Sequence, residues 1–172
     1  MPTAQFALLQ DRGVVRITGA DAMPLLDGLL TNSLGRLDHQ PALHTGLLSP
    51  QGKILFDFFL ISIGKNFLID IDRTMADDLI KRLSFYRLRA DVQFENISDT
   101  QSVAALWPAG TSLPGGVISY PDPRHGDLGL RLILAPERIA EIPADEAQAE
   151  DYHAHRISLG VPEAGTDYLL PD

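Results

Sequence analysis

The chain has 172 residues, 45% of them hydrophobic, and a mean hydropathy of +0.01, values typical of a globular protein with one domain or two small ones. Its 23 acidic and 14 basic residues give a formal net charge of −9, so we expect no nucleic-acid partner. There is no cysteine, which excludes disulfides and thiolate metal ligands within the sequence. The sequence has neither an apolar run of about 20 residues nor the basic start and apolar core of a signal peptide, so we expect no membrane partner and an intracellular protein.

The chain is predicted to begin with a hairpin and a helix. Residues 6–9 and 14–17 are short apolar runs separated by Gln-Asp-Arg-Gly, a sequence that suits a tight turn. In "ADAMPLLDGLLTN" the leucines then lie on one helical stripe, and Pro24 falls in the first turn, where proline is tolerated. These patterns predict a β-hairpin followed by a helix.

The next segment is predicted to form three strands, a helix and a fourth strand. The stretch "HTGLLSPQGKILFDFFLISIGKNFLIDI" is strand-like, and proline and glycine interrupt it at residues 49–52 and 64–66. Apolar residues then recur at helical spacing from Met75 to Tyr86, and "ADVQFENIS" alternates like a strand. This order favours an α+β layer rather than the parallel sheet of βαβ units.

The second half of the chain shows a similar mixture. Strands are predicted at residues 102–107, 117–120 and 128–134, and "ADEAQAEDYHAHRISLG" is predicted to form a helix that ends at Gly160. His153 and His155 would point away from each other on that helix, so we expect no metal site. We divide the chain into two packed α+β subdomains, residues 1–98 and 99–172.

One carboxylate stands out in the segment "KILFDFFLI", residues 53–61. Alternate side chains of a strand point to opposite faces, and here both faces are apolar except at Asp57, so the strand is predicted to be buried on both sides. A buried ionised carboxylate is costly unless it is paired or used. Asp57 is therefore either a functional group or a structural one, exposed on an open sheet face or paired with an arginine such as Arg87 or Arg89.

Three stretches follow one another along the chain: "ITGADAMPLLDGLLTNSL", "GLLSPQGKILFDFFLI" and "HRISLGVPEAGTDYLLPD". In this order and spacing they resemble the folate-binding YgfZ family, whose members are related to the glycine-cleavage T-protein, an aminomethyltransferase. The Gln-Gly-Lys before Phe-Asp and the closing Gly-Val-Pro-Glu look most like the branch that acts in iron-sulfur cluster assembly. The resemblance implies a T-protein-like folate-binding fold, α+β, with mostly antiparallel sheets and packed helices in two subdomains.

The resemblance also implies a site for tetrahydrofolate. T-proteins carry an Asp-Asp pair in the strand that corresponds to "QGKILFDF", and one of these carboxylates meets the reacting end of the folate; here the pair reads Phe56-Asp57. T-proteins hold the pterin ring with a glutamate near the closing helix, where this sequence has Ser158. The folate-binding residues that we infer are Asp57, Asn32, Arg156, Ser158 and His44.

The implied function is that of a tetrahydrofolate-binding protein in iron-sulfur cluster assembly or repair. Its partners would be iron-sulfur assembly or client proteins, and its location the cytoplasm of a bacterium or the mitochondrial matrix of a eukaryote. One alternative is a tetrahydrofolate-dependent aminomethyltransferase, which Phe56 and Ser158 disfavour because they replace two carboxylates of the T-protein site. The other is a non-catalytic interaction domain. The family's C-terminal barrel and its Lys-Gly-Cys-Tyr-x-Gly-Gln-Glu motif would follow Asp172, so we expect an N-terminal portion of a longer protein.

Several polar residues also have a purely structural interpretation. Asn32 follows the first predicted helix and suits a C-terminal cap. Arg156 suits either a bidentate contact with a carboxylate or an exposed helix surface. The stretch "KRLSFYRLR" contributes Lys81, Arg82, Arg87 and Arg89, which would attract the glutamate tail of a folate or simply complement the helix dipole.

Overall fold

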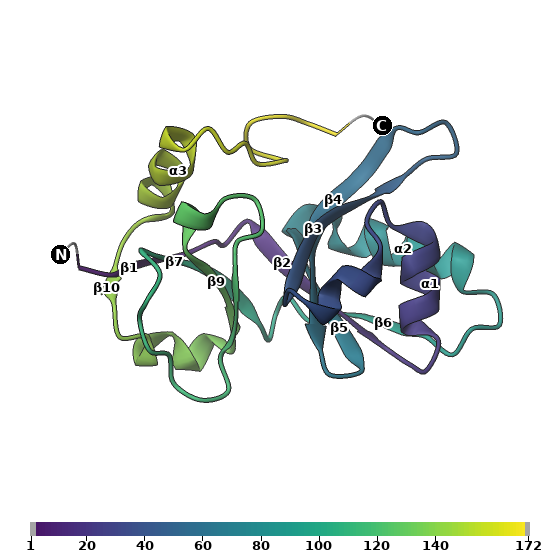
Figure 1. Ribbon diagram of the computed structural model, residues 1–172, viewed down its shortest axis with the longest axis horizontal. Coiled ribbons are helices and arrows are strands. Elements are labelled where there is room, and N and C mark those ends of the chain that lie inside the picture. Colours follow the sequence, from purple (N-terminus) through teal and green to yellow (C-terminus); the bar gives the residue numbers. More distant parts are fainter. Residues whose placement is uncertain (1–2, 171–172) are drawn as a thin grey trace.

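Two five-stranded sheets, each with its own helices, lie side by side in the computed structural model, which describes residues 3–170 (Figure 1). The first sheet has the order β3-β4-β5-β2-β6, with β2 (Arg12–Thr18), β3 (Ala42–Leu48), β4 (Ile54–Ile63), β5 (Asn66–Asp72) and β6 (Gln93–Asn96). The second has the order β10-β1-β7-β9-β8, with β1 (Gln5–Leu8), β7 (Ser102–Trp107), β8 (Ile118–Pro121), β9 (Leu130–Leu134) and β10 (Asp145–Glu146). Only β1 and β10 pair in parallel among the described strands, so the expected α+β fold with mostly antiparallel sheets is confirmed.

The first two α-helices cover the outer face of the first sheet, and the third contributes Tyr152 to the core between the sheets. Helices α1 (Ala22–Leu29) and α2 (Ala76–Arg87) bury their apolar stripes on one face of the first sheet, and α3 (Ala149–Ser158) lies beside the second sheet, ending just before Gly160. Short 3-10 helices complete the set: η1 (Leu34–Asp38), η2 (Arg73–Met75), η3 (Gly126–Leu128) and η4 (Pro136–Glu141). Within residues 3–170, no helix has the length and apolar character needed to span a membrane.

Strand β4 is internal to the first sheet and contributes to two hydrophobic cores. Phe56 and Phe58 point toward α1 and α2, and both are almost fully buried. Phe59 and Ile61, on the opposite face, pack in a second core that lies between the two sheets. The strand is therefore buried on both faces over its second half, as its apolar pattern predicts, while Ile54 at its start is exposed.

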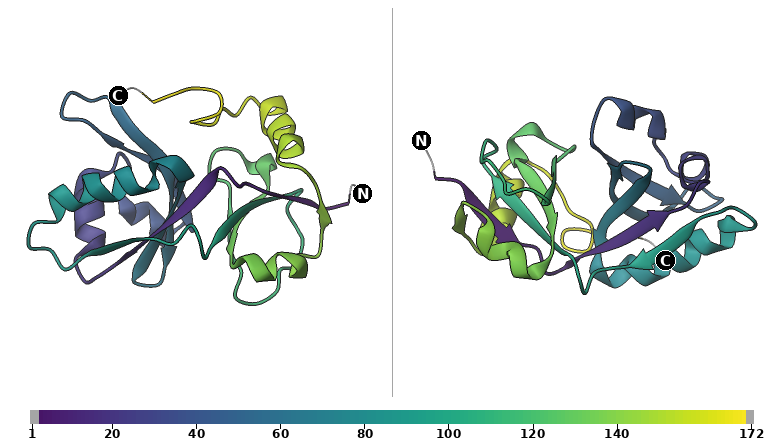
Figure 2. Two further views of the ribbon diagram at one scale, coloured as in Figure 1. Left: turned by 180° about the vertical axis from the view of Figure 1, so that it is seen from behind. Right: turned by 90° about the horizontal axis from the view of Figure 1, so that it is seen from below.

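The predicted hairpin of residues 6–9 and 14–17 is wrong. Strand β1 pairs with β7 in the second sheet, and β2 pairs with β5 and β6 in the first. Seen from behind, the chain passes directly from one sheet to the other between β1 and β2 (Figure 2). A turn sequence only shows that the chain changes direction, whereas the partner of each strand depends on burial of both its faces by distant elements.

The other predicted elements are close to those observed. The three strands of residues 44–71 are β3, β4 and β5, and the strongest helical pattern is α2, extended at its start by η2. Strands β7, β8 and β9 match the predicted ranges within one or two residues. The division of the chain into two subdomains at residue 98 stays a prediction. Strand β1 belongs to the first of them by sequence but pairs in the second sheet.

Candidate functional site

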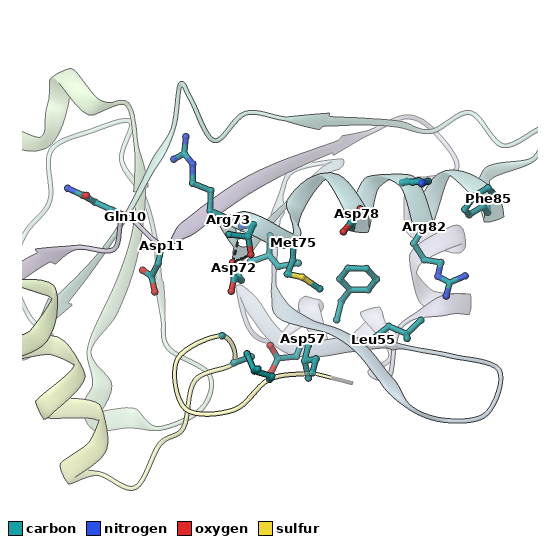
Figure 3. Close-up of a pocket in the computed structure, with 18 residues that line it drawn as sticks. Gln10, Asp11, Leu55, Asp57, Asp72, Arg73, Met75, Asp78, Arg82 and Phe85 are labelled. Carbon is teal, nitrogen blue, oxygen red and sulfur yellow. Dashed lines mark hydrogen bonds between the residues drawn. The ribbon is translucent and has the colours of Figure 1, made fainter. Parts of the chain in front are cut away.

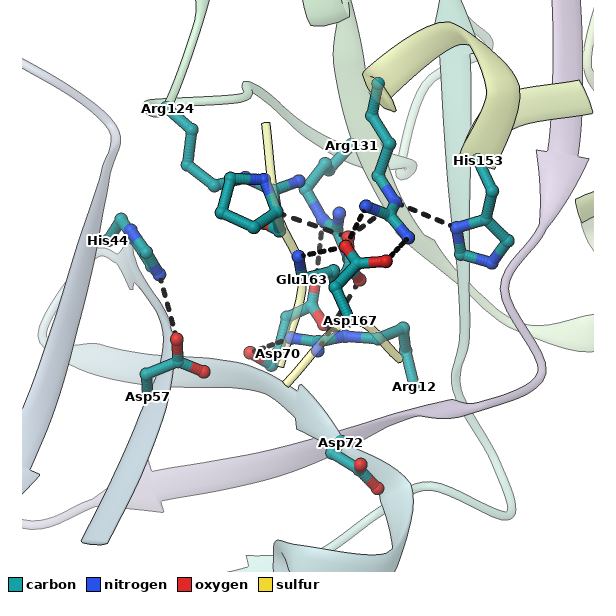
Figure 4. A network of polar contacts seen from close by, with 12 residues as sticks. Arg12, His44, Asp57, Asp70, Asp72, Arg124, Arg131, His153, Glu163 and Asp167 are labelled. Atoms are coloured by element: carbon teal, nitrogen blue, oxygen red, sulfur yellow. Dashed lines mark hydrogen bonds and ion pairs between the residues drawn. The ribbon is translucent and has the colours of Figure 1, made fainter. Parts of the chain in front are cut away.

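Asp57 lies on β4 with its side chain 17% exposed, and its carboxylate has two partners. The Tyr168 hydroxyl donates to Asp57 Oδ2 at 2.6 Å. His44 Nε2 lies 3.5 Å from the same oxygen, and Figure 4 shows this second contact. Both contacts use Oδ2, and no described residue donates a hydrogen bond to Oδ1. Of the structural alternatives for Asp57, an ion pair with Arg87 or Arg89 is wrong, because neither forms an ion pair with it among residues 3–170.

The position of His44 follows from the register of two strands. Gly46 on β3 is the Cα partner of Asp57 on β4, so His44, two residues before Gly46, is a diagonal neighbour of Asp57 on the same face. Asn32 supports this arrangement from the loop after α1, since its side-chain amide donates to the His44 carbonyl at 2.7 Å. Asn32 is thus tied to β3 and is not a cap of α1.

The carboxylate of Asp57 is ionised at neutral pH. Its partial burial alone would raise its pKa, but the hydrogen bonds from His44 and Tyr168 and the positive charge of Arg12 outweigh burial and bring the pKa below its ordinary value. Burial and the hydrogen bond to Asp57 raise the pKa of Tyr168, so its hydroxyl stays protonated and donates. Asp57 therefore presents a negatively charged acceptor at the surface of the sheet.

A cavity of about 890 Å³ opens beside Asp57. It lies between the start of β4, helix α2 and the closing segment, residues 161–170, and its walls include Leu55, Phe56 and Met75 (Figure 3). This volume falls within the roughly 300–1,000 Å³ that is usual for small-molecule sites. The cavity is large enough for a ligand of drug size in contact with Asp57.

Behind Asp57, a buried charge cluster joins the two sheets. At its centre, the fully buried carboxylate of Asp70 on β5 accepts hydrogen bonds at 2.7 Å from the Nε atoms of Arg12 and Arg131. The Tyr120 hydroxyl donates to the same carboxylate at 2.8 Å. Burial would raise the pKa of Asp70, but the two guanidiniums outweigh it and lower the pKa to about 2. Residues from β2, β5, β8 and β9 are thereby fixed relative to one another.

The closing segment is held on this cluster by charged side chains. Glu163 is buried and lies 3.2 Å from Arg124 and 3.7 Å from Arg12. The fully buried Arg156 of α3 pairs with the carboxylate of Asp167 and donates to the Val161 carbonyl at the start of the segment. These contacts hold the segment in the position from which Tyr168 reaches Asp57.

Any other residue at Gly165 in the closing segment would strain the backbone and displace the Asp72 side chain. Its φ of +84° lies in the left-handed region, and a Cβ atom there would come within 2.2 Å of Asp72 Oδ2. The segment therefore passes close over the end of β5, at the edge of the cavity.

The structure brings some of the inferred folate-binding residues together and separates others. Asp57 and His44 are in contact, and Asn32 holds the backbone of His44. Arg156 is buried against Asp167, so it does reach a carboxylate, but one that belongs to the protein itself. Ser158 is exposed, donates to the carbonyl of His155 in its own helix and does not line the cavity.

Two residues of the charge cluster carry the same sequence signal as Asp57. Asp70 interrupts the apolar run "NFLIDI", and Arg131 interrupts "LGLRLILA". A charge inside a buried strand needs a partner, and this argument applies to both residues. In the structure the two side chains pair with each other across the two sheets. No pattern in the sequence indicates Tyr168, which lies 111 positions from Asp57.

Replacing Tyr168 with phenylalanine should raise the pKa of Asp57. The variant loses one of the hydrogen bonds that stabilise the ionised carboxylate, and we expect a stability cost of about 1 kcal/mol. An NMR titration of the Asp57 carboxyl carbon measures the change. Tyr86→Phe on α2 is the control and should leave this pKa unaltered; an unaltered pKa in Tyr168→Phe would show that the hydroxyl does not act on Asp57.

Comparisons with known proteins identify sequence relatives of this chain. No family model matches the chain. The mitochondrial iron-sulfur cluster assembly factor IBA57 homolog of Mycosarcoma maydis is 30% identical over 96% of this chain and 45% of its own length. The human mitochondrial factor IBA57 is 32% identical over 92% of this chain and 51% of its own length. The chain thus spans about half the length of the curated relatives it matches.

The fold has a counterpart among solved structures. The glycine cleavage system aminomethyltransferase T from Bartonella henselae superposes with a TM-score of 0.77 at 15% identity, covering 96% of this chain and 53% of that protein. At this identity the likeness concerns the fold alone. The resemblance inferred from the sequence is confirmed: this chain is a homologue of the mitochondrial iron-sulfur cluster assembly factors named IBA57 and has the fold of the glycine cleavage aminomethyltransferase.

Proposed function

We propose that this protein binds a reduced folate at Asp57 and acts in the assembly of iron-sulfur proteins. The observation that carries the folate part is Asp57 itself: an ionised, largely buried carboxylate beside a cavity of ligand size, whose Oδ1 accepts no hydrogen bond from residues 3–170. A reduced pterin has several N–H groups, which are suitable donors for such an acceptor. Asp57 would hold and orient the ring, and His44 would keep the carboxylate in place.

The iron-sulfur part of the proposal comes from the relatives. Those named above are called iron-sulfur cluster assembly factors, and the match extends over nearly all of this chain. Because the chain spans about half of their length, we propose this activity for the whole protein rather than for the described residues alone. Its partners would be assembly or client proteins, and its place the mitochondrial matrix in a eukaryote or the cytoplasm in a bacterium.

Aminomethyl transfer, the alternative activity, is less well supported by the residues near Asp57. Phe56 stands where the T-protein pattern has a second carboxylate, and its ring is buried against the helices of the first sheet. Ser158, at the position we align with the pterin-holding glutamate, lies away from the cavity. The site therefore fits a folate ligand through Asp57 but lacks two acidic groups of the aminomethyltransferase.

Asp57→Asn tests the proposal. The amide keeps the packing but loses the negative charge, so tetrahydrofolate should bind about 1–3 kcal/mol more weakly, while the unfolding temperature should change little. Calorimetric titration and thermal unfolding are measured on the same variant. Asp127→Asn is the control, because Asp127 is exposed and does not line the cavity.

Two results would contradict the proposal. A large loss of stability in Asp57→Asn with unchanged folate affinity would make Asp57 a structural residue. Absence of binding by the unaltered protein would favour the interaction-domain alternative.

A further inference from the structure

The cavity beside Asp57 has an uneven distribution of charge. At one end lie three carboxylates, those of Asp11, Asp57 and Asp72. At the other end helix α2 contributes Lys81 and Arg82, and Figure 3 shows Arg82 directed from the helix toward Leu55 on the opposite wall. Apolar side chains line the space between the two ends. Such a cavity suits a ligand with a donor-rich ring at one end and an anionic group at the other.

Arg82 is half-buried, yet none of the residues 3–170 gives it an anionic partner. Among residues 3–170 no carboxylate lies within 4 Å of its guanidinium or of the Lys81 ammonium, although Asp78 is only one helical turn before Arg82. By contrast, Arg73 at the other end of the cavity is paired with Asp99 at 2.6 Å. A half-buried guanidinium with five N–H donors and no partner is well suited to bind a carboxylate of a ligand.

The other cations of "KRLSFYRLR" do not share this position. Arg87 and Arg89 do not line the cavity, and the Arg87 guanidinium is directed at the Val92 carbonyl. The positive charge at this end of the cavity therefore comes from Lys81 and Arg82, in one turn of α2. It does not come from the cations that follow at the helix terminus. Phe85, which is 65% exposed, lies on α2 just beyond Arg82 and adds an apolar surface at the same end of the cavity (Figure 3).

We propose that Arg82, assisted by Lys81, binds the carboxylates of the glutamate tail of the folate whose pterin ring meets Asp57. This inference rests on the folate function proposed above. It makes Arg82 a specificity-determining residue: the acidic end recognises the ring, and the cationic end distinguishes a folate from a pterin without a tail. The apolar walls accommodate the aromatic linker between them.

Two ligands and two variants of the protein test the inference. Tetrahydrofolate carries the tail, and tetrahydropterin has the same ring system without it. Arg82→Gln should weaken tetrahydrofolate binding roughly tenfold, the usual effect of losing one charge-assisted hydrogen bond, and change tetrahydropterin binding less than twofold. Arg82→Lys should restore part of the affinity for tetrahydrofolate. The matched control is Arg89→Gln, since Arg89 is exposed and outside the cavity, and it should change neither affinity.

The outcomes separate this inference from the function on which it rests. If the unaltered protein binds both ligands and Arg82→Gln weakens neither, or weakens both equally, the tail site is wrong and the folate function stands. If the unaltered protein binds neither ligand, both are wrong. A loss confined to tetrahydrofolate, with an unchanged unfolding temperature, supports the tail site.

Discussion

Replacing Asp70 with asparagine should lower the free energy of unfolding by about 3–5 kcal/mol, the usual cost of removing one partner from a buried ionic group. The variant leaves Arg12 and Arg131 buried without their shared counter-charge. Urea unfolding at pH 7 measures the loss. Asp72→Asn is the control: Asp72, two residues further along, only accepts hydrogen bonds from Thr74, and asparagine can do the same, so it should cost less than about 1 kcal/mol.

The effect of Asp70→Asn should depend on pH. The pKa of Asp70 is about 2 in the folded protein and about 3.9 in an unfolded chain, so its ionisation stabilises the fold by about 3 kcal/mol above about pH 5. This contribution is lost as the pH falls through 2, because the carboxyl then becomes neutral in both states. The stability difference between the two proteins should therefore shrink between about pH 5 and pH 2. A difference that stays constant over this range would mean that Asp70 is not ionised in the folded state.

Replacing Phe59 with alanine should cost about 3–5 kcal/mol of unfolding free energy. The ring is almost fully buried between the sheets, and three guanidiniums face it, with Arg131, Arg124 and Arg12 at 4.5, 4.9 and 5.7 Å from its centroid. The loss thus combines a cavity in the core with the loss of cation–π contacts in a desolvated site. Chemical denaturation of the purified variant measures the sum.

A second pair of variants separates these two causes. Phe59→Leu and Phe58→Leu both remove an aromatic ring from β4 and keep most of the volume, but Phe58 faces the helices and has no guanidinium over its ring. Phe59→Leu should therefore be the more destabilising of the two by about 1–2 kcal/mol. Equal losses of unfolding free energy in the two variants would show that the cation–π contacts to the Phe59 ring do not add to stability.

The parts of the fold that were predictable from the sequence are those whose signal is local. Helix α2 and strands β3, β4 and β5 have strong periodic patterns bounded by proline and glycine, and they lie where the pattern places them. The pairing of β1 with β7 was not predictable in this way, since the nearer turn sequence favoured the wrong partner. The residues of β1 do not show whether it pairs with the next strand in a hairpin or with a strand much later in the chain.

The candidate site was predictable only where a residue contradicts its own surroundings. Asp57 is a charge within an apolar strand and was identified for that reason, and Asp70 and Arg131 give the same signal. Arg156 was not distinguishable from a surface arginine, because a helix shows which residues share a face but not whether that face is covered. Tyr168 lies in an irregular segment, where its neighbours place no constraint on its direction.

The pairing of β1 with β7 has a consequence for the order in which the molecule assembles. Phe6 is the Cα partner of Leu106, one hundred positions further along, so the second sheet is built from contacts of very large sequence separation. As the chain leaves the ribosome, β2 to β6 can pair as soon as residue 96 is available, while β1 waits unpaired for β7 and β10. During that interval the apolar edge of β1 is open to pairing with other chains. Slower synthesis of residues 97–107 should therefore increase aggregation of the nascent chain, while the first sheet is little affected.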